Sequence, residues 1–192
     1  MQQLPAEPYA QLLGLYLGDG CLAKTRHGFQ LRITMDSAYP GIINEAAATV
    51  AAFAQGRAVG CYPVRGEQCV NVTCYALFWA CLLPQHGAGK KHNRPIVLEP
   101  WQETLIAAAP GRFARGLIQS DGWRGENRVH AKGRDYSYSR YQFSNRSDEI
   151  RALFTWACDL LAVEWRPRGR WHISVARRAS VARLDEFVGI KA

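Results

Sequence analysis

Hydrophobic and polar residues follow the same order twice along this chain. Residues 29–35 alternate strictly between apolar and polar side chains, which predicts a strand with one buried face. The first half continues with an alanine-rich helix over residues 41–54, strands over 58–63 and 68–74, and a short helix over 75–83. The second half repeats this order with a strand over 140–144, a helix over 149–161, strands over 165–168 and 170–176, and a helix over 180–188.

Each copy of the pattern opens with an apolar helical segment that ends in Asp-Gly. The first segment is LLGLYLGDG, residues 12–20, and the second is ARGLIQSDG, residues 114–122. Each half therefore has the order αββαββα, which predicts an α+β fold of two related halves. We assign residues 1–83 to the first half-domain, 84–110 to a linker with a helix near 101–108, and 111–192 to the second half-domain.

Small residues lie four positions apart on both Asp-Gly segments and therefore share one face of each helix. These residues are Gly14 and Gly18 on the first segment, and Gly116 and Ser120 on the second. Small side chains allow two helices to approach to backbone contact. We expect the two faces to pack together around a pseudo-twofold axis, so that the helix ends carrying Asp19 and Asp121 emerge side by side.

Two carboxylates at neighbouring helix C-termini require a positive partner, because the helix dipole and their mutual repulsion both disfavour them. Oxygen ligands suit Mg²⁺, which keeps water molecules that can be activated to attack a phosphodiester. We expect Asp19 and Asp121 to bind Mg²⁺, with backbone oxygens of Gly18 and Ser120 as further ligands; Mn²⁺ or Ca²⁺ can substitute for binding. The glycine after each aspartate is expected to adopt a left-handed conformation that frees these oxygens. Asp-Gly also caps helices without metal, but its occurrence at equivalent places in both halves favours a metal site.

The charge of the chain indicates a nucleic-acid partner. The 192 residues are 48% hydrophobic, which is ample for a core, and carry a net charge of +8 with a pI near 9.4. Residues 106–192 hold 16 Lys and Arg against 9 Asp and Glu, whereas residues 1–105 hold 8 against 7. Most of the positive residues are arginine, which suits contacts to phosphate and guanine. The second hairpin is longer than its first-half counterpart, and its extra length falls in residues 125–139. A basic surface without any partner is the alternative explanation for the charge.

Other site types find little support. The six cysteines form no CxxC pair and most lie in apolar segments, so we expect buried free thiols. The five histidines are scattered, so no histidine metal cluster is visible. No apolar run is long enough to cross a membrane and the N-terminus lacks a signal-peptide pattern, so we expect an intracellular protein, cytoplasmic or nucleoid-associated.

The two Asp-Gly segments resemble the motifs of the LAGLIDADG homing endonucleases, in the single-chain form that carries two motif copies. The first segment keeps the family's first Leu, its Gly, its Leu and the final Asp-Gly, while the second keeps Gly-Leu-Ile and the final Asp-Gly and follows Phe113. The earlier acid of the motif is replaced by Leu17 and Gln119, at a position that is not a metal ligand in the family. The resemblance implies that the motif helices form an interface, that Asp19 and Asp121 bind the catalytic metals, and that four antiparallel strands of each half form a saddle over the DNA major groove. Cleavage of both strands would occur across the minor groove.

The family often places a lysine after the last helix of a half, near the scissile phosphate. Lys90 and Lys91 match this position in the first half, although a solvated lysine pair in a linker is the alternative. Lys191 follows the final helix, but its correspondence is weak.

Strand parity predicts which side chains face the core and which face DNA. The expected core residues are Leu31, Ile33, Tyr141, Phe143, Trp171, Ile173 and Val175. The expected DNA-facing residues are Gln30, Arg32, Thr34, Arg140, Gln142, Ser144, Arg170, His172 and Ser174 on the strands, with Arg65 and Arg168 at turns. Exposed polar strand faces are also common in proteins without any ligand.

These observations predict a monomeric, site-specific, Mg²⁺-dependent endonuclease that cuts both strands of a long, asymmetric double-stranded DNA target. The alternative is a DNA- or RNA-binding protein on the same fold that does not cleave, such as an intron maturase or a regulator. An excised intein endonuclease and a metal-free structural protein are less favoured.

Overall fold

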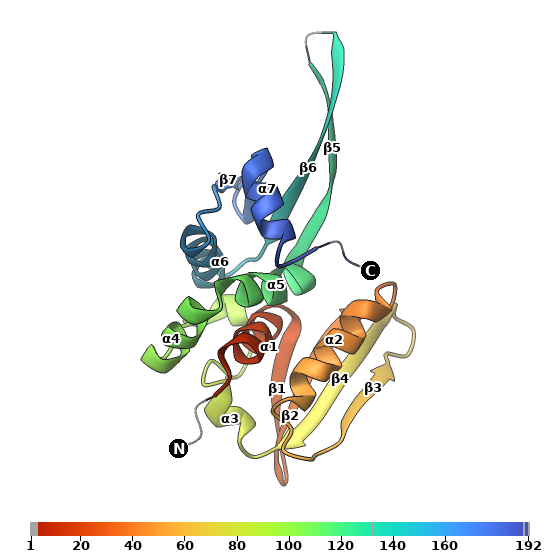
Figure 1. The fold of residues 1–192 in the computed structure, drawn as a ribbon. Helices are drawn as coiled ribbons and strands as arrows, with labels where there is room; N and C mark the ends of the chain where they lie inside the picture. Colours follow the sequence, from red (N-terminus) through yellow and green to blue (C-terminus); the bar gives the residue numbers. More distant parts are fainter. Residues whose placement is uncertain (1–3, 132, 190, 192) are drawn as a thin grey trace.

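Two α/β units lie side by side and meet through two central helices, α1 and α5, in the computed structural model (Figure 1). The structure describes residues 4–131, 133–189 and 191. Each unit has one sheet; α2 (Pro40–Ala51) packs against the first sheet, and α6 (Asp148–Leu160) and α7 (Arg178–Asp185) pack against the second. The opposite faces of the sheets are therefore left without a helical cover.

The first half contains three helices and an antiparallel sheet with the strand order β1-β2-β4-β3. Its elements are α1 (Ala6–Asp19), β1 (Gly20–Thr25), β2 (Gly28–Asp36), α2 (Pro40–Ala51), β3 (Val59–Pro63), β4 (Cys69–Ala76) and α3 (Trp79–Leu82). The helix expected over residues 75–83 is shorter than predicted. Ala76 still pairs with Phe29 of β2, so the sheet extends two residues into the segment assigned to that helix.

The segment between the halves contains a 3-10 turn, η1 (Lys91–Asn93), and the predicted helix, α4 (Pro100–Ala108). A capping box starts α4, because the Glu99 side chain accepts from the backbone of Gln102 and the Gln102 side chain accepts from the Glu99 backbone. This segment also carries Lys91 to the ends of the central helices.

The second half repeats the plan, with the strand order β5-β6-β8-β7. Its elements are α5 (Pro110–Asp121), β5 (Gly122–Ala131), β6 (Arg134–Ser144), α6 (Asp148–Leu160), β7 (Arg166–Arg168), β8 (His172–Val175) and α7 (Arg178–Asp185). The prediction of an α+β fold with two four-stranded antiparallel sheets is confirmed.

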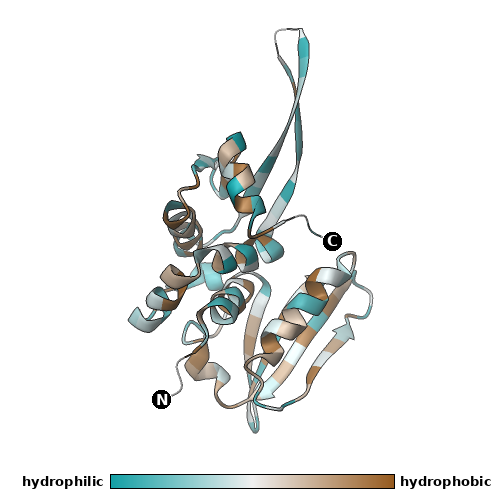
Figure 2. Cartoon of the chain, in the orientation of Figure 1, coloured by the Kyte–Doolittle hydropathy of each residue, from teal (hydrophilic) through white to brown (hydrophobic). Residues whose placement is uncertain are grey.

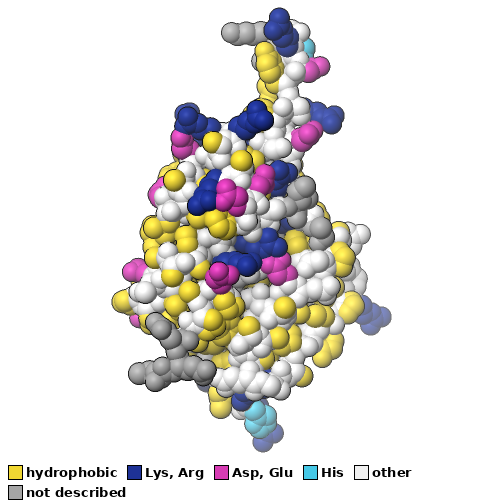
Figure 3. Space-filling view, in the orientation of Figure 1, with side chains coloured by type: hydrophobic (Ala, Val, Ile, Leu, Met, Phe, Trp, Pro, Cys, Tyr) yellow, Lys and Arg dark blue, Asp and Glu magenta, His cyan; other side chains and the backbone are white. Residues whose placement is uncertain are grey.

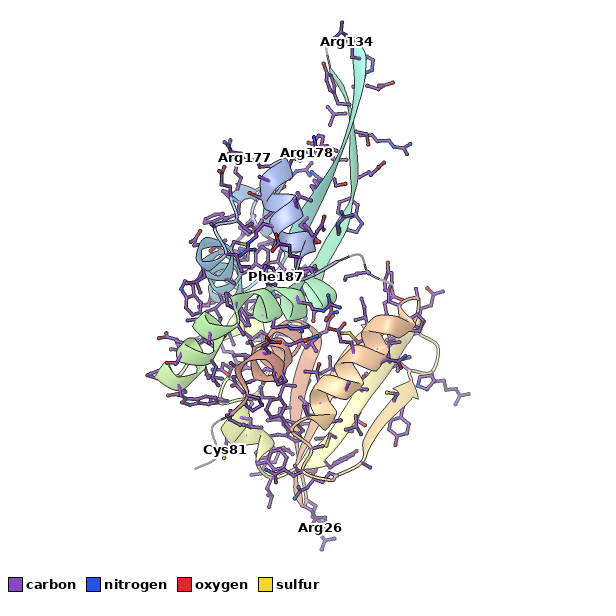
Figure 4. The ribbon with its side chains drawn as sticks, in the orientation of Figure 1. Arg26, Cys81, Arg134, Arg177, Arg178 and Phe187 are labelled. Carbon is purple, nitrogen blue, oxygen red and sulfur yellow. The ribbon has the colours of Figure 1, made fainter. Side chains whose placement is uncertain are left out.

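The β5–β6 hairpin projects from the body of the second half (Figure 1). Strand β8 pairs with residues Tyr141 to Ser144 of β6, so within the described residues no third strand pairs with the outer part of the hairpin. Arg134 lies at its tip (Figure 4), and both basic and acidic side chains occur along the hairpin (Figure 3). The prediction that the second hairpin is the longer one is confirmed.

Strand parity predicts the core correctly except at one position. Hydrophobic and hydrophilic bands alternate along the strands of the first sheet (Figure 2), and the other six expected core residues are buried. Trp171 is 38% exposed, so its placement in the core was wrong. It precedes β8 and lies in a turn, where the alternation of a strand does not apply. The guanidinium groups of Arg146 and Arg170 stand 5.0 and 5.4 Å from the centre of its ring.

All six cysteines are free, but only Cys74 and Cys158 are buried. The expectation of buried thiols was wrong for Cys21, Cys61 and Cys81, which are exposed. Among the helices in the described part of the chain, none is long and apolar enough to cross a membrane.

Candidate active site

The motif helices α1 and α5 meet at backbone contact. A methyl group on Gly14 would lie 2.5 Å from the carbonyl oxygen of Phe113 and 3.0 Å from the Cα of Gly116. A methyl group on Gly116 would lie 2.5 Å from the carbonyl oxygen of Gln11. These distances are shorter than normal contacts, so only hydrogen fits at either position. The two glycines therefore set how closely the helices approach.

Gly18 and Ser120 continue this contact toward the helix ends. A methyl group on Gly18 would lie 2.3 Å from the Cβ of Ser120. The Ser120 hydroxyl donates to the carbonyl oxygen of Gly116 at 3.0 Å, so the serine side chain stays within the interface. The carbonyl oxygen of Gly18, expected as a metal ligand, accepts a hydrogen bond from Lys91 at 2.6 Å.

Gly20 and Gly122 do not adopt the left-handed conformation, so that prediction was wrong. Their φ angles are −83° and −108°, because each residue starts a strand directly after its helix. Glycine is needed here for space. A methyl group would lie 2.4 Å from the Cα of Tyr16 at Gly20 and 2.6 Å from the Cα of Ile118 at Gly122. The chain can thus turn from helix to strand without a connecting loop.

Asp19 and Asp121 are the last residues of the two motif helices. Asp19 keeps contact with solvent, but the groups crowded around its carboxylate exclude most nearby water. Burial, together with the charge of the neighbouring Asp121, raises the pKa of Asp19 to about 6, although Lys91 and Lys191 oppose the rise. Burial also raises the pKa of Asp121, opposed by a hydrogen bond from Asn145 Nδ2 to Asp121 Oδ2 of 2.6 Å. The pair therefore gains from added positive charge.

Lys91 supplies part of that charge. Its ammonium group donates to the carbonyl oxygens of Tyr16, Gly18 and Gly20 at 2.5, 2.6 and 2.8 Å, which satisfies the open C-terminal end of α1. Burial lowers the pKa of Lys91 to about 8, opposed by the charge of the two aspartates. Lys90 is exposed beside it.

Each acid opens into its own cavity with a lysine. Asp121 lines a cavity of about 560 Å³ that also contains Lys90, Lys91, Asn145, Arg146 and His172. Asp19 lines a cavity of about 140 Å³ with Asp36, Tyr39, Ser120 and Lys191. Lys191 is half-buried, and its pKa is lowered by burial and opposed by Asp19 and Asp121. The two cavities thus repeat the same acid and lysine on either side of the helix pair.

The donor set fits a hard divalent cation with few protein ligands. The two carboxylates with raised pKa values would be stabilised by such an ion. No group of three or more His, Cys, Asp or Glu side chains that could hold a metal occurs within residues 4–131, 133–189 and 191. Water and a bound phosphate would therefore complete the coordination, which is typical of Mg²⁺ rather than of a structural zinc site.

A polar network joins the halves beside this site. The Glu45 carboxylate on α2 accepts from Arg115 Nε at 2.5 Å, from Arg115 Nη2 at 2.6 Å and from Gln119 at 2.8 Å, and also from Gln11. Arg115 donates as well to the carbonyl oxygen of Phe187 at 2.8 Å. Burial alone would raise the pKa of Glu45, but these hydrogen bonds bring it below its usual value. Gln119 stands at the motif position where the family has an acid, and in this protein it donates a hydrogen bond to Glu45.

The predicted DNA-facing residues lie on the strands and turns of the two sheets, and their contact with DNA stays a prediction. Those in the first half are Gln30, Arg32 and Thr34 on β2 and Arg65 in the β3–β4 turn, and those in the second are Arg140, Gln142 and Ser144 on β6, Arg168 on β7, Arg170 in the turn after it, and His172 and Ser174 on β8. Arg32, Arg65, Arg168 and Arg170 are exposed, whereas the others are half-buried. Ser144 and His172 form a hydrogen bond of 2.6 Å between Oγ and Nδ1.

Asn145 and Arg146 were not recognised as site residues from sequence. They were assigned only to the cap before α6, yet both line the Asp121 cavity. Their distance from Asp121 along the chain hides this proximity. The pairing register of β5 and β6 could have indicated them, because Phe143 pairs with Gly122, the residue after Asp121, and this places the residues just beyond Phe143 near the acid.

Comparison with known proteins supports the fold. No family model matches the chain, and no curated protein matches it. Solved structures do match. I-DmoI in complex with DNA and Mn has a TM-score of 0.59 at 13% identity, covering 97% of this chain and 98% of that chain. I-WcaI bound to its DNA recognition sequence has a TM-score of 0.59 at 11% identity, covering 99% and 84%. The N-terminal LAGLIDADG domain of DUF199/WhiA has a TM-score of 0.59 at 12% identity, covering 98% and 84%. The chain therefore has the fold of the LAGLIDADG homing endonucleases.

Proposed function

We propose that this protein is a site-specific endonuclease that hydrolyses both strands of double-stranded DNA with a divalent metal, Mg²⁺ in the cell. The observation that carries the proposal is the pair Asp19 and Asp121 at adjoining helix ends, each in a cavity with a lysine. Two acids whose pKa values are raised by burial and proximity suit a cation-dependent site better than a structural turn.

The uncovered faces of the two sheets would bind the duplex. The strands of the second sheet and the turn between β7 and β8 carry Arg140, Arg166, Arg168 and Arg170. The guanidinium groups of Arg140 and Arg170 lie 5.8 and 5.4 Å from the ring centres of the exposed Trp123 and Trp171. Arginine binds phosphate and guanine, and polar strand residues can read base edges in the major groove. The basic second half and its projecting hairpin favour an asymmetric target contacted over a longer stretch on that side. I-AabMI bound to uncleaved DNA and I-WcaI bound to its recognition sequence have this fold, which supports a DNA partner.

Asp19 and Asp121 would hold the metal, which supplies a polarised phosphate and an activated water when bound. Asn145 donates to the Oδ2 atom of Asp121 and orients that carboxylate. Lys91 and Lys191 place positive charge beside the phosphate, where it stabilises the negative charge that develops during attack. In each cut the oxygen of water bonds to phosphorus, the bond to one deoxyribose oxygen breaks, and that oxygen takes up a proton from the water. I-DmoI was crystallised with Mn, which supports divalent metal use on this fold.

One chain supplies both acids and both lysines, so we propose that it acts as a monomer. A binding protein that does not cut is the second candidate, because the fold match extends equally to the LAGLIDADG domain of DUF199/WhiA, which is not described as a nuclease. The presence of both acids favours the nuclease.

The test is cleavage by purified protein, with Mg²⁺ or Mn²⁺, of a duplex library that includes the DNA flanking its own gene. The Asp19→Asn and Asp121→Asn variants should bind the selected target and fail to cut it. Target binding without any cut by the unmodified protein in either metal would refute the nuclease and support the binding function. Absence of specific binding to the duplex would refute both the nuclease and a DNA-binding function.

A further inference from the structure

The two cavities beside the acids differ in size and in charge. Apart from their lysines, the Asp121 cavity is lined by Arg94 and Arg146, whereas the Asp19 cavity is lined by Asp36. The first is about 560 Å³ and the second about 140 Å³. A phosphodiester carries a negative charge, so it is attracted to the first cavity and repelled by the acid in the second.

This charge difference falls at equivalent positions of the two halves. The glycine after each motif aspartate pairs with Ile33 in the first sheet and with Phe143 in the second. The third residue beyond these partners is Asp36 in the first half and Arg146 in the second. The pseudo-twofold axis therefore relates a carboxylate to a guanidinium group.

The two acids also differ in whether a side chain one residue before Asp36 or Arg146 can donate a hydrogen bond to them. The second residue beyond the same partners is Met35 in the first half and Asn145 in the second. Asn145 donates to Asp121 at 2.6 Å and fixes that carboxylate, whereas Met35 is 3% exposed and has no hydrogen to donate. Asp121 is thus oriented before DNA binds, and Asp19 lacks a donor from the equivalent position.

We propose that the two DNA strands are cut in a fixed order: first the strand whose phosphate enters the Asp121 cavity, and later the strand facing Asp19. Arg146 accelerates the first cut by stabilising the phosphate, Asn145 acts as a positioning residue for Asp121, and Asp36 slows the second cut. The inference rests on the proposed nuclease function and adds to it an intermediate, a duplex nicked in one particular strand.

The experiment follows each strand of a selected target, labelled at opposite ends, during a single turnover in Mg²⁺. One strand should be cut at least about threefold faster than the other, with the nicked duplex accumulating between. Arg146→Gln should slow the faster strand about three- to tenfold and leave the slower one within twofold, because one favourable charge is lost at one site only. Asp36→Asn keeps the oxygen that accepts from the Ala38 amide and should accelerate the slower strand about threefold.

Two matched controls remove one positive or one negative charge at a position away from both cavities. Arg178→Gln on α7 and Glu103→Gln on α4 lie outside both cavities on the helical side of the molecule, and should leave the ratio of the two rates unchanged. A second readout needs no metal. In EDTA, replacing the scissile phosphate of the faster strand by neutral methylphosphonate should weaken binding more than the same change in the slower strand. Arg146→Gln should reduce that difference, because Arg94 and the lysines of the cavity remain.

Equal rates for the two strands would overturn the inference while leaving the nuclease intact. So would a rate ratio that Arg146→Gln and Asp36→Asn do not move, or that Arg178→Gln and Glu103→Gln move equally. Absence of any cut would refute the nuclease, and the order of cutting with it.

Discussion

Replacing Gly116 by alanine tests whether backbone contact between the motif helices holds the site together. The new methyl group would lie 2.5 Å from the Gln11 carbonyl oxygen, 2.8 Å from the Leu15 nitrogen and 3.0 Å from the Gly14 Cα. A relaxed contact is about 3.5 Å, so the helices must separate by roughly 1 Å. Overpacking costs about 1–3 kcal/mol, whereas alanine gains about 1 kcal/mol over glycine in a helix.

We therefore expect a net loss of up to about 2 kcal/mol in the free energy of unfolding, measured in urea, and a Tm lower by up to about 8 °C. A shift of roughly 1 Å between the acids should also reduce cleavage about 100-fold. Gly111→Ala on the same helix is the control. Its methyl group meets the Phe187 side chain rather than backbone, so stability should change by less than about 1 kcal/mol.

Adding Gly14→Ala to Gly116→Ala should cost less than the sum of the single changes, because both methyl groups occupy the same gap. A Gly116→Ala variant at least as stable as the unmodified protein would refute the close-packing argument. It would mean that helix propensity alone decides the effect.

Three further predictions address charge. Asp19→Asn should stabilise the metal-free protein at pH 7 by up to about 1 kcal/mol, a figure reduced for solvent screening because Asp19 is exposed. The pKa of Asp19 is raised to about 6, so between about pH 4 and 6 the folded protein keeps a proton that the unfolded chain releases, and the unmodified protein loses stability as the pH rises through that window whereas the variant does not. Urea unfolding at pH 4 and 7 checks this, and a variant less stable than the unmodified protein at pH 7 would contradict it. Glu45→Gln should cost about 1–3 kcal/mol at pH 7, since it leaves Arg115 without its carboxylate. Because the pKa of Glu45 is lowered, this contribution to stability is present at neutral pH and disappears as the pH falls through that lowered pKa. The control is Glu164→Gln in the exposed pair of Glu164 and Arg177, which should change stability by less than about 0.5 kcal/mol; equal effects of the two changes would contradict the argument. Arg168→Ala should weaken target binding and reduce the slope of the logarithm of the binding constant against the logarithm of salt concentration by about one, whereas the control Arg178→Ala should leave the slope unchanged. If a titration from about 50 to 200 mM salt shows no difference between the two variants, Arg168 does not contact the DNA.

Local patterns predicted most of the fold because they record local physics. Strict alternation marks a strand with one buried face, and it predicted β2 together with its core residues Leu31 and Ile33. The spacing of Gly14 and Gly116 within their segments indicated that two helices could meet at backbone contact, which the structure shows. Trp171 was misplaced because alternation was extended past the end of a strand.

The site was only partly predictable, because its geometry depends on residues far apart in the chain. Asp19 and Asp121 could be named from the repeated motif, but the three carbonyl oxygens bound by Lys91 could not, since the lysine lies more than 70 residues from each. Asn145 likewise reaches Asp121 only because β6 pairs with β5.

The sequence by itself determined two αββαββα halves, a small-residue face on each motif helix and an acid at the end of each, since these follow from periodicity and spacing along one element. Tertiary structure alone decided that the two acids occupy unequal cavities, one with Arg146 and the other with Asp36. The physical reason is that a cavity is formed by side chains from several elements. Its size and charge follow from how those elements pack, which no single segment encodes.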